Sequence, residues 1–245
     1  MQRKLVLQFI FLFVSLLNGN VPAEGLPKHR VSAGGGFGPQ SSETERLARY
    51  LPMEKGGYWS YVAEAADARW ISLRILEKDR LKNADCLKVE ISADSIAGPR
   101  KHVNLICVVE KAGARMVLRN GYTEYDPPLP ILRSPLRVGQ KWEWEGTERW
   151  TVGQGHMEES NTKYEFEIEK QEEVQVPAGR FRAVKLTISK YPLAAHPHTL
   201  SKNPTLVVHY WFAKDVGIVK ATGFGLLFGI HGELKEFTSL NLHEK

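Results

Sequence analysis

Apolar and polar residues alternate along several stretches of this 245-residue chain, and this two-residue period constrains the fold more than any other feature. In residues 164–169, the sequence YEFEIE alternates an aromatic or aliphatic side chain with a glutamate. The same period recurs at 71–75 and at 87–91. Because successive side chains of a strand point to opposite faces, the pattern predicts strands with one buried and one hydrated face. We expect about ten to twelve antiparallel strands and an all-β fold.

A tight turn is predicted between two of these strands. Val176-Pro177-Ala178-Gly179 has proline at the second position and glycine at the fourth, as a type I turn favours. The turn should join a strand that ends near Val176 to a strand over residues 181–189.

One short helix is predicted ahead of the strands. Residues 24–42 are rich in glycine, proline and serine, which is typical of a flexible leader. Ser42 and Glu45 then have the spacing of a capping box, in which two side chains satisfy the first free N–H groups of a helix. We expect a helix over residues 43–50, which Pro52 ends.

The N-terminus has the three-part layout of a cleavable secretory signal peptide. Arg3 and Lys4 precede an apolar run at 5–17, and the small residues Val21 and Ala23 stand three and one before the predicted cut. The apolar run is shorter than the roughly 20 residues of a membrane-spanning helix. We expect cleavage after Ala23, no membrane span in the mature chain, and a periplasmic or extracellular location in a bacterium.

The charge of the chain argues against nucleic acid as a partner. The formal net charge is +5, and loss of the signal peptide removes two cations and no anion. The remaining 31 Lys and Arg and 28 Asp and Glu are interspersed, as in KYEFEIEKQEE. Because a nucleic-acid-binding surface usually clusters its basic residues, we predict no nucleic-acid partner.

The chain repeats itself in three ordered blocks. Residues 52–61 match residues 135–144 at an offset of 83, with proline, glycine and tryptophan in register and an aromatic residue two positions after the tryptophan. Two further pairs of segments follow in the same order: 86–92 with 183–189, and 109–111 with 212–214. We interpret the blocks as an internal duplication. The predicted divisions are a signal peptide (1–23), a flexible leader (24–42), a first β repeat (43–133) and a second β repeat (134–245).

The two cysteines of the chain, Cys86 and Cys107, are predicted to form a disulfide. Exported proteins reach an oxidising compartment in which paired cysteines persist. If the segment between them forms a hairpin centred between Ile96 and Ala97, the two cysteines face each other across it. Directly opposed residues of an antiparallel pair lie about 4.5–5.5 Å apart, which is within disulfide range.

Three segments resemble a family of uncharacterised exported bacterial proteins: PLRVGQKWEWEG at 135–146, EEVQVPAGRFRAVKL at 172–186 and HYWFAKDVGIVKATG at 209–223. The family pattern is a P-L-x-x-G-x-x-W opening, a V-P-A-G-x-F hairpin and a W-F-A-x-x-V-G-I-V-K strand pair. The family is similar to a larger group of periplasmic domains of unknown function, some of them named after the type IV pilus assembly protein TapB. The resemblance implies an antiparallel curved sheet, or open half-barrels similar to lipoprotein carriers, and it implies no catalytic residues.

Signals for metal binding or catalysis are weak in this sequence. His196 and His198 could place two imidazoles on one metal, but a site needs further ligands, for which His209 and Asp215 are the candidates. The chain has no G-x-S-x-G elbow for a nucleophilic serine. Paired acids could cut glycosides, but the strand glutamates alternate with aromatic residues and fit a hydrated face better. These glutamates are Glu143, Glu145, Glu165 and Glu167. We therefore predict no enzyme activity, no cofactor and no metal.

Two aromatic pairs are the strongest candidates for ligand contact. Trp59 and Tyr61, like Trp142 and Trp144, stand two residues apart, so each pair points to one face of its strand. The pairs could pack in a core, or they could form a wall for an apolar ligand or a sugar. Because duplicated strands could place the pairs on facing walls of one concave sheet, we predict that these four residues share an interior and bind the ligand.

These observations favour an exported, non-catalytic envelope protein that presents a β groove or surface to an apolar ligand or to another envelope protein. The alternatives are a secreted hydrolase whose site the sequence does not disclose, and a structural or assembly factor at the cell surface. A continuous apolar groove would favour binding, whereas a polar pocket with convergent histidines or acids would favour an enzyme.

Overall fold

The structure is a computed structural model, and it describes most of the chain after the predicted leader. The described residues are 47–63, 68–81, 84–95, 98–111, 114–120, 123–152, 156–193, 203–223, 226–227 and 230–238. The predicted signal peptide and flexible leader lie outside them. No helix in the described part of the chain has the length and apolarity needed to cross a membrane.

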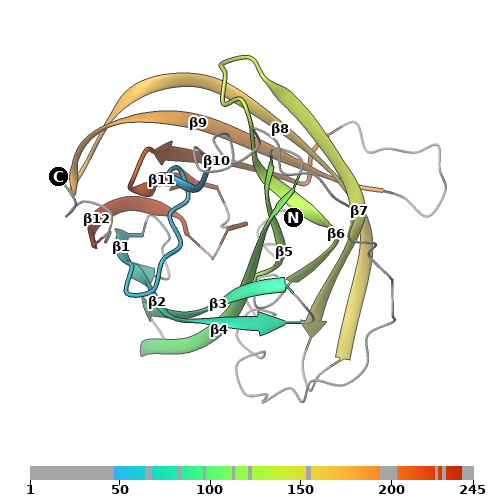
Figure 1. Ribbon diagram of the computed structural model, residues 1–245, viewed down its shortest axis with the longest axis horizontal. Helices are drawn as coiled ribbons and strands as arrows, with labels where there is room; N and C mark the ends of the chain where they lie inside the picture. Colours follow the sequence, from blue (N-terminus) through green and yellow to red (C-terminus); the bar gives the residue numbers. More distant parts are fainter. Residues whose placement is uncertain are drawn as a thin grey trace, which may run out of the picture.

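Twelve β-strands in the described residues form a closed antiparallel barrel (Figure 1). In chain order they are β1 (Tyr58–Val62), β2 (Ala68–Leu81), β3 (Ala84–Ser95), β4 (Gly98–Lys111), β5 (Ala114–Asn120), β6 (Thr123–Arg133), β7 (Lys141–Val152), β8 (His156–Val176), β9 (Gly179–Pro192), β10 (Leu206–Ala213), β11 (Gly217–Thr222) and β12 (Gly232–Thr238). Neighbours in the sequence are neighbours in the barrel. The predicted all-β, antiparallel architecture is therefore confirmed.

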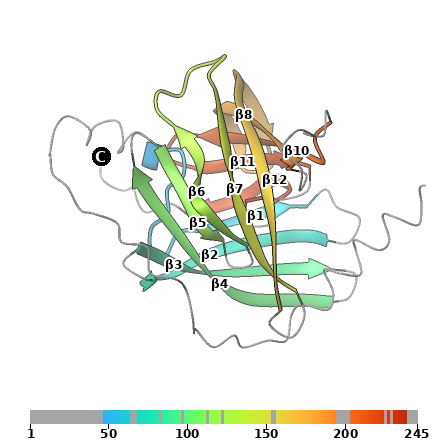
Figure 2. The same cartoon turned by 90° about the vertical axis from the view of Figure 1, so that its right-hand side faces the viewer.

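The pairing of β1 with β12 closes the sheet on itself. Tyr58 lies opposite Thr238 and Val62 lies opposite Glu233, while the other side of β1 pairs with β2. Figure 2 shows the strands inclined to one another around the barrel, as closure requires. The prediction of a curved sheet or open half-barrels is wrong, because the strands that would form the two open edges, β1 and β12, pair with each other.

The predicted N-terminal helix is not a helical element of the described structure. Residues 43–46 of the predicted span lie outside the described residues, and the helical conformation at 47–48 gives way directly to a turn. The Tyr50 N–H donates to the Leu47 carbonyl at 3.0 Å, which is the tighter spacing of a turn. Leu47 and Leu51 are buried in the barrel core, so side-chain packing holds this segment against the barrel.

The turn predicted from the Val-Pro-Ala-Gly sequence joins β8 to β9, at the predicted position. β8 ends at Val176, β9 begins at Gly179, and these two residues face each other. Gly179 has a φ of 137°, which glycine adopts without the steric cost that a Cβ would bring. The Ala178 N–H donates to the Leu234 carbonyl at 2.9 Å, which ties the turn to β12.

The two predicted repeats begin with matching turns. Gly56 has a φ of 86° and Gly139 has a φ of 84°. The Gly56 N–H donates to the Ile75 carbonyl at 2.9 Å, and the Gly139 N–H donates to the Ile168 carbonyl at 2.8 Å. In both halves the isoleucine N–H donates back to the residue after the glycine at 2.9 Å. Each turn is thereby bound to the second strand of its own half, and the duplication itself stays a prediction.

Inward-facing side chains form one connected hydrophobic core, and aromatic rings supply much of its volume. The largest fully buried side chains include Tyr61, Tyr125, Tyr164, Tyr210, Phe166 and Phe212. Burial raises the pKa of Tyr61 and Tyr210 above the ordinary value for tyrosine, because the charged phenolate would be desolvated there. Both hydroxyl groups therefore stay neutral at physiological pH; that of Tyr61 donates to the Ile218 carbonyl at 3.0 Å, and that of Tyr210 accepts from the Leu227 N–H at 2.7 Å.

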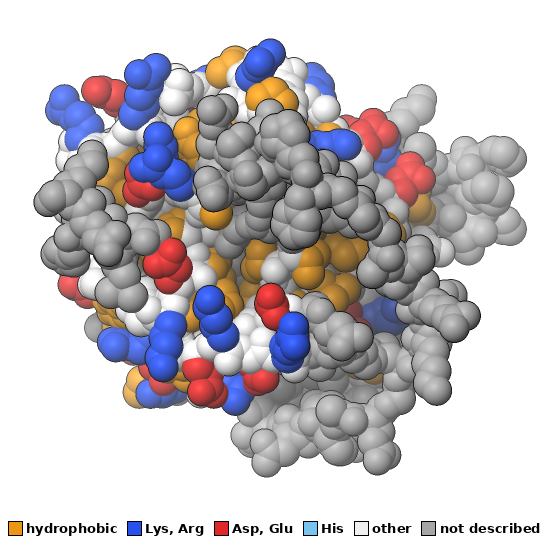
Figure 3. All heavy atoms as spheres, in the orientation of Figure 1, with side chains coloured by type: hydrophobic (Ala, Val, Ile, Leu, Met, Phe, Trp, Pro, Cys, Tyr) orange, Lys and Arg blue, Asp and Glu red, His pale blue; other side chains and the backbone are white. Residues whose placement is uncertain are grey.

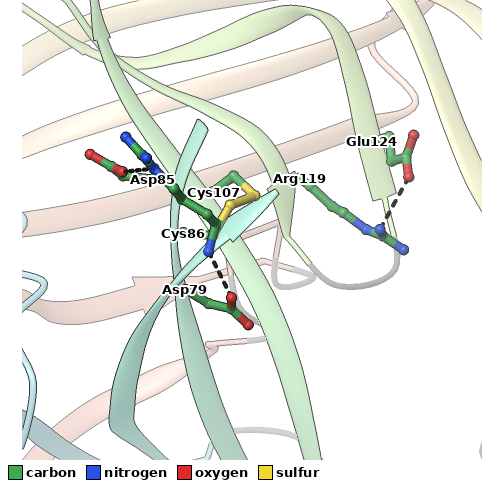
Figure 4. The surroundings of a disulfide bond; sticks show 7 residues. Asp79, Asp85, Cys86, Cys107, Arg119 and Glu124 are labelled. Atoms are coloured by element: carbon green, nitrogen blue, oxygen red, sulfur yellow. Dashed lines mark hydrogen bonds and ion pairs between the residues drawn. A yellow bond between two sulfur atoms is a disulfide. The ribbon is translucent and has the colours of Figure 1, made fainter. Parts of the chain in front are cut away.

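The predicted disulfide between Cys86 and Cys107 is confirmed (Figure 4). The two residues face each other on β3 and β4 in the register expected of the hairpin, and their Cα atoms are 4.0 Å apart. Both cysteines are buried. Arg119 on β5 lies opposite Cys107, and Glu124 on β6 lies opposite Arg119, with which it forms an ion pair at 3.5 Å. The bridge thus lies in a continuous row of contacts across neighbouring strands.

Removing the disulfide should destabilise the barrel. We expect the double variant Cys86→Ala, Cys107→Ala to lose about 3 kcal/mol of unfolding free energy, because the bridge restricts the unfolded chain over a separation of 21 residues. Urea unfolding followed by circular dichroism measures the difference. Reductant should shift the wild-type midpoint and leave the double variant unchanged, and equal midpoints for the two proteins without reductant would contradict the prediction.

Candidate functional site

The four aromatic residues predicted to contact a ligand lie inside the barrel. Trp59 and Tyr61 are on β1, and Trp142 and Trp144 are on β7, half-way around the strand order. All four are buried and belong to the same connected core. Trp142 stacks on Phe166 of β8, with ring centroids 5.1 Å apart and planes inclined by 4°. The four rings do share one interior, and ligand binding by them stays a prediction.

The polar edge of each of these rings is bonded to the backbone. On β1, the Trp59 Nε1 donates to the Val216 carbonyl at 2.7 Å, and the Tyr61 hydroxyl donates to the Ile218 carbonyl at 3.0 Å. On β7, the Trp142 Nε1 donates to the Pro130 carbonyl at 2.9 Å, and the Trp144 Nε1 donates to the Pro127 carbonyl at 3.0 Å. A buried donor without a partner is costly, so these bonds favour a single orientation for each ring. Trp142 and Trp144 therefore tie β7 to the neighbouring β6, and Trp59 and Tyr61 tie β1 to β11 and the residue before it, across the intervening β12.

A small apolar cavity of about 20 Å³ lies beside Trp59 and Tyr61. It has room for about one water molecule, whereas small-molecule sites usually measure about 300–1,000 Å³. Residues 51–53 line the cavity. Two contacts fix the chain just before this segment. Arg49 forms an ion pair with Asp215, and the Asp215 N–H donates to the Arg49 carbonyl at 2.6 Å. An apolar ligand could enter here only if this segment moved.

A polar cluster around one buried carboxylate also faces the interior, and no prediction from the sequence included it. Glu148 on β7 is 2% exposed. Its carboxylate accepts hydrogen bonds from the Tyr164 hydroxyl at 2.5 Å, the Lys190 Nζ at 2.5 Å and the Thr162 hydroxyl at 3.2 Å. Desolvation raises the pKa of Tyr164 well above its ordinary value, so its hydroxyl remains a donor. With its charge balanced and its oxygens bonded, Glu148 fits a structural role between β7, β8 and β9.

The position of Glu148 in the sequence carried a signal that could have located it. Glu148 is separated from Trp142 and Trp144 by an even number of residues, so the two-residue period places its side chain on the same, buried face of β7. The glutamates weighed as a possible acid pair have the opposite parity. In the structure, Glu143 and Glu165 lie on the outer face, and each is 3.0 Å from the Lys163 Nζ.

The outer face of β12, β1, β2 and β3 carries a polar depression of about 300 Å³, here called the outer groove. Its lining residues are Tyr58, Ser60, Trp70, Ser72, Arg74, Glu90, Ser92, Lys235 and Glu236. Ser60, Ser72 and Ser92 are direct cross-strand neighbours and form a serine row across three strands. Because these side chains are small, the groove follows the row, with Glu236 opposite Ser60 at one end.

Larger side chains border the serine row. Tyr58 and Arg74 are cross-strand partners, and the Arg74 guanidinium carbon lies 5.0 Å from the centroid of the Tyr58 ring. The Tyr58 hydroxyl donates to a Glu236 carboxylate oxygen at 3.4 Å. On the opposite side of the row, Trp70 is 37% exposed. No prediction from the sequence included these residues, because the serine row depends on the register of β1 with β2 and of β2 with β3, and one end of the groove depends on β12, which is distant from β1 in sequence.

The metal candidates are not brought together in the described structure. His209 Nδ1 is hydrogen-bonded to the Thr187 hydroxyl at 2.7 Å, and Asp215 is paired with Arg49. No group of three or more His, Cys, Asp or Glu side chains within the described residues could hold a metal ion. His196 and His198 lie outside the described residues, so their candidacy as metal ligands stays a prediction.

No protein-family model matches the chain, and no curated protein matches it in sequence. Among solved structures, one similar chain is a presumed exported protein with a YmcC-like fold from Bacteroides fragilis. It is 14% identical to this chain, with a TM-score of 0.44, and the match covers 76% of this chain and 97% of that one. Another is a presumed lipoprotein from Parabacteroides distasonis, with 12% identity, 77% and 98% coverage and a TM-score of 0.46.

Replacing the buried carboxylate should destabilise the barrel. We expect Glu148→Gln to lose about 3 kcal/mol of unfolding free energy, because the partly buried Lys190 ammonium, whose side chain is 29% exposed, would lose its charge partner. The matched control, Glu143→Gln, removes an exposed carboxylate on the same strand and should change stability by less than about 1 kcal/mol. Urea unfolding measures both variants, and equal losses would contradict a special role for Glu148.

Proposed function

We propose that this chain is an exported, non-catalytic envelope protein that binds its ligand or partner through the outer surface of the barrel, at the outer groove. One observation carries the proposal. The interior cavity beside Trp59 and Tyr61 measures about 20 Å³, whereas the outer groove measures about 300 Å³. Volume for a ligand therefore exists outside the barrel wall, next to exposed polar and aromatic side chains.

The composition of the outer groove also supports a binding role. Tryptophan, tyrosine and arginine are the residues most enriched among those that carry binding energy, and the groove has one of each in Trp70, Tyr58 and Arg74. The three stand on β1 and β2, and the inner face of β1 is fixed by Trp59 and Tyr61. A site on strands anchored in this way is already formed before a ligand arrives, which lowers the entropic cost of binding.

The proposal assigns no reaction to the protein. A catalytic acid or base has to reach a substrate in a pocket, and its pKa is tuned there. The outer groove has two carboxylates, and both have partners: Glu90 is 2.6 Å from the Lys101 ammonium, and Glu236 accepts from the Tyr58 hydroxyl at 3.4 Å. Among the buried side chains in the described structure, Glu148 is the charged one, and Lys190, Tyr164 and Thr162 already occupy its carboxylate. These contacts support a carboxylate that stabilises the barrel.

An apolar ligand inside the barrel is a second candidate. Figure 3 favours it, because hydrophobic side chains are visible in the hollow at the centre of this face while charged side chains surround the rim. The small cavity beside Trp59 and Tyr61 is also lined by apolar residues. Binding there would require residues 51–53 to move away from the barrel.

Cross-linking in cells tests the outer-surface proposal even while the ligand is unidentified. A photo-reactive residue replaces Lys235, which is exposed at the rim of the outer groove, or Lys141, which is exposed on β7 as a matched control. In cells that export the protein, we expect a defined adduct at position 235 and none at position 141. Adding Ser72→Arg, which fills the groove, should remove the adduct. Equal labelling at both positions would contradict the proposal.

Tryptophan fluorescence tests the interior candidate. If the outer surface is the binding site, titrating the mature protein with a long-chain fatty acid should give no saturable change in emission. A saturable change that Met53→Trp abolishes, by filling the interior cavity, and that Ser72→Arg leaves intact would replace the first proposal with the second.

A further inference from the structure

We propose that the outer groove binds a neutral carbohydrate, either a short oligosaccharide or one stretch of a longer glycan. This inference rests on the proposed function and adds the chemical class of the ligand. It depends on three properties of the groove: a floor of hydroxyl groups, bordering aromatic rings and balanced charge.

The floor of the groove offers hydroxyl groups at regular spacing. Ser60 lies opposite Ser72, and Ser72 lies opposite Ser92, so the three serines stand on neighbouring strands about 4.8 Å apart. Ser72 and Ser92 are partly exposed, whereas Ser60 is 5% exposed and closes the end of the row. Each serine hydroxyl can donate one hydrogen bond and accept two, as a sugar hydroxyl can. A row across three strands is long enough for two linked sugar rings. An apolar ligand would instead dehydrate these hydroxyls without giving them partners, which is unfavourable.

The borders of the groove offer ring faces. Trp70 lies beside the row and is 37% exposed, so part of its indole is free to contact a ligand. The face of an aromatic ring carries partial negative charge and a large apolar area, which suits the weakly positive C–H groups on one side of a sugar ring. On the other border, Tyr58 is covered by the Arg74 guanidinium at 5.0 Å, which directs the guanidinium along the groove wall.

The charges of the groove balance, which favours a neutral ligand. The lining contains the cations Arg74 and Lys235 and the anions Glu90 and Glu236. Glu90 is also 2.6 Å from the Lys101 ammonium, which lies outside the lining, so the acidic probe below tests whether the two cations outweigh the remaining carboxylate. A phosphate or an acidic glycan would meet both carboxylates, and a basic peptide would meet both cations. The hydroxyls of a neutral sugar can accept from the guanidinium and donate to a carboxylate together.

The size of the groove also distinguishes a glycan from a protein partner. Its volume of about 300 Å³ lies at the lower end of the range for small-ligand sites. A stable protein–protein interface instead buries about 800 Å² on each partner over a broad, well-packed area. A recess floored by three serines fits a narrow chain better than such an area.

Calorimetric titration of the mature protein with purified oligosaccharides tests the inference. The probes are neutral tetrasaccharides of glucose, galactose, mannose and N-acetylglucosamine, with a polygalacturonate oligomer as the acidic comparison. We expect saturable binding of at least one neutral probe and weaker binding of the acidic one. Trp70→Ala should weaken the affinity for the bound probe roughly fivefold to tenfold, through loss of the ring contact.

Matched variants separate the groove from the rest of the surface. Ser72→Arg should weaken binding at least about tenfold, because its side chain occupies the groove. Ser189→Arg places the same side chain on the outer face of β9, opposite Glu165, and should bind as the wild type does. If Ser72→Arg does not fold, as judged by circular dichroism, Trp70→Ala decides the question, because its ring is already partly exposed.

Three outcomes would overturn the inference: no neutral probe binds, the acidic probe binds more tightly than the neutral ones, or Trp70→Ala binds as tightly as Ser189→Arg. Failure here is distinguishable from failure of the proposed function. A defined adduct at position 235 in cells, together with no neutral glycan bound in the calorimeter, would retain the outer surface as the binding site and exclude this ligand class.

Discussion

The pairing of β1 with β12 is the contact on which the rest of the structure depends. β1 has only five residues, yet it pairs along its whole length with β12 on one side and β2 on the other. Without this strand pair, the sheet would have two open edges, and exposed edges favour pairing with other chains. Closure also separates an inside from an outside, so each residue of the alternating pattern is assigned either to the core or to water.

That separation connects the core to the candidate site. On β1, Trp59 and Tyr61 point inward and bond to backbone carbonyls across the core, while Tyr58 and Ser60 line the outer groove. The same short strand therefore anchors the wall from inside and forms the recess outside. Since large rings fill the interior and small serines stand on the exterior, the recess lies on the outer face of the barrel. The proposed function follows from this distribution of side-chain volume.

Parts of the fold that depend on neighbours close in sequence could be predicted. The turn at Val176–Gly179 and the disulfide between Cys86 and Cys107 each belong to a single hairpin, whose register a short stretch of sequence specifies. The two-residue period also placed the four predicted aromatic residues on inward faces. It held a further signal at Glu148, whose parity marked it as buried, although its partners Tyr164 and Lys190 come from two other strands.

The sequence by itself determined that the chain forms antiparallel strands, which of their faces is apolar, and which cysteines can pair, because each of these follows from chemistry repeated over a few residues. Only the tertiary structure decided that the sheet closes through β1 and β12, and that Lys235 and Glu236 of β12 join the serine row at the outer groove. The physical reason is the distance along the chain. β1 meets β12 across nearly the whole described sequence, and local propensity does not specify the register of strands so far apart. Whether a barrel is filled or hollow likewise depends on the summed volume of side chains from all its strands.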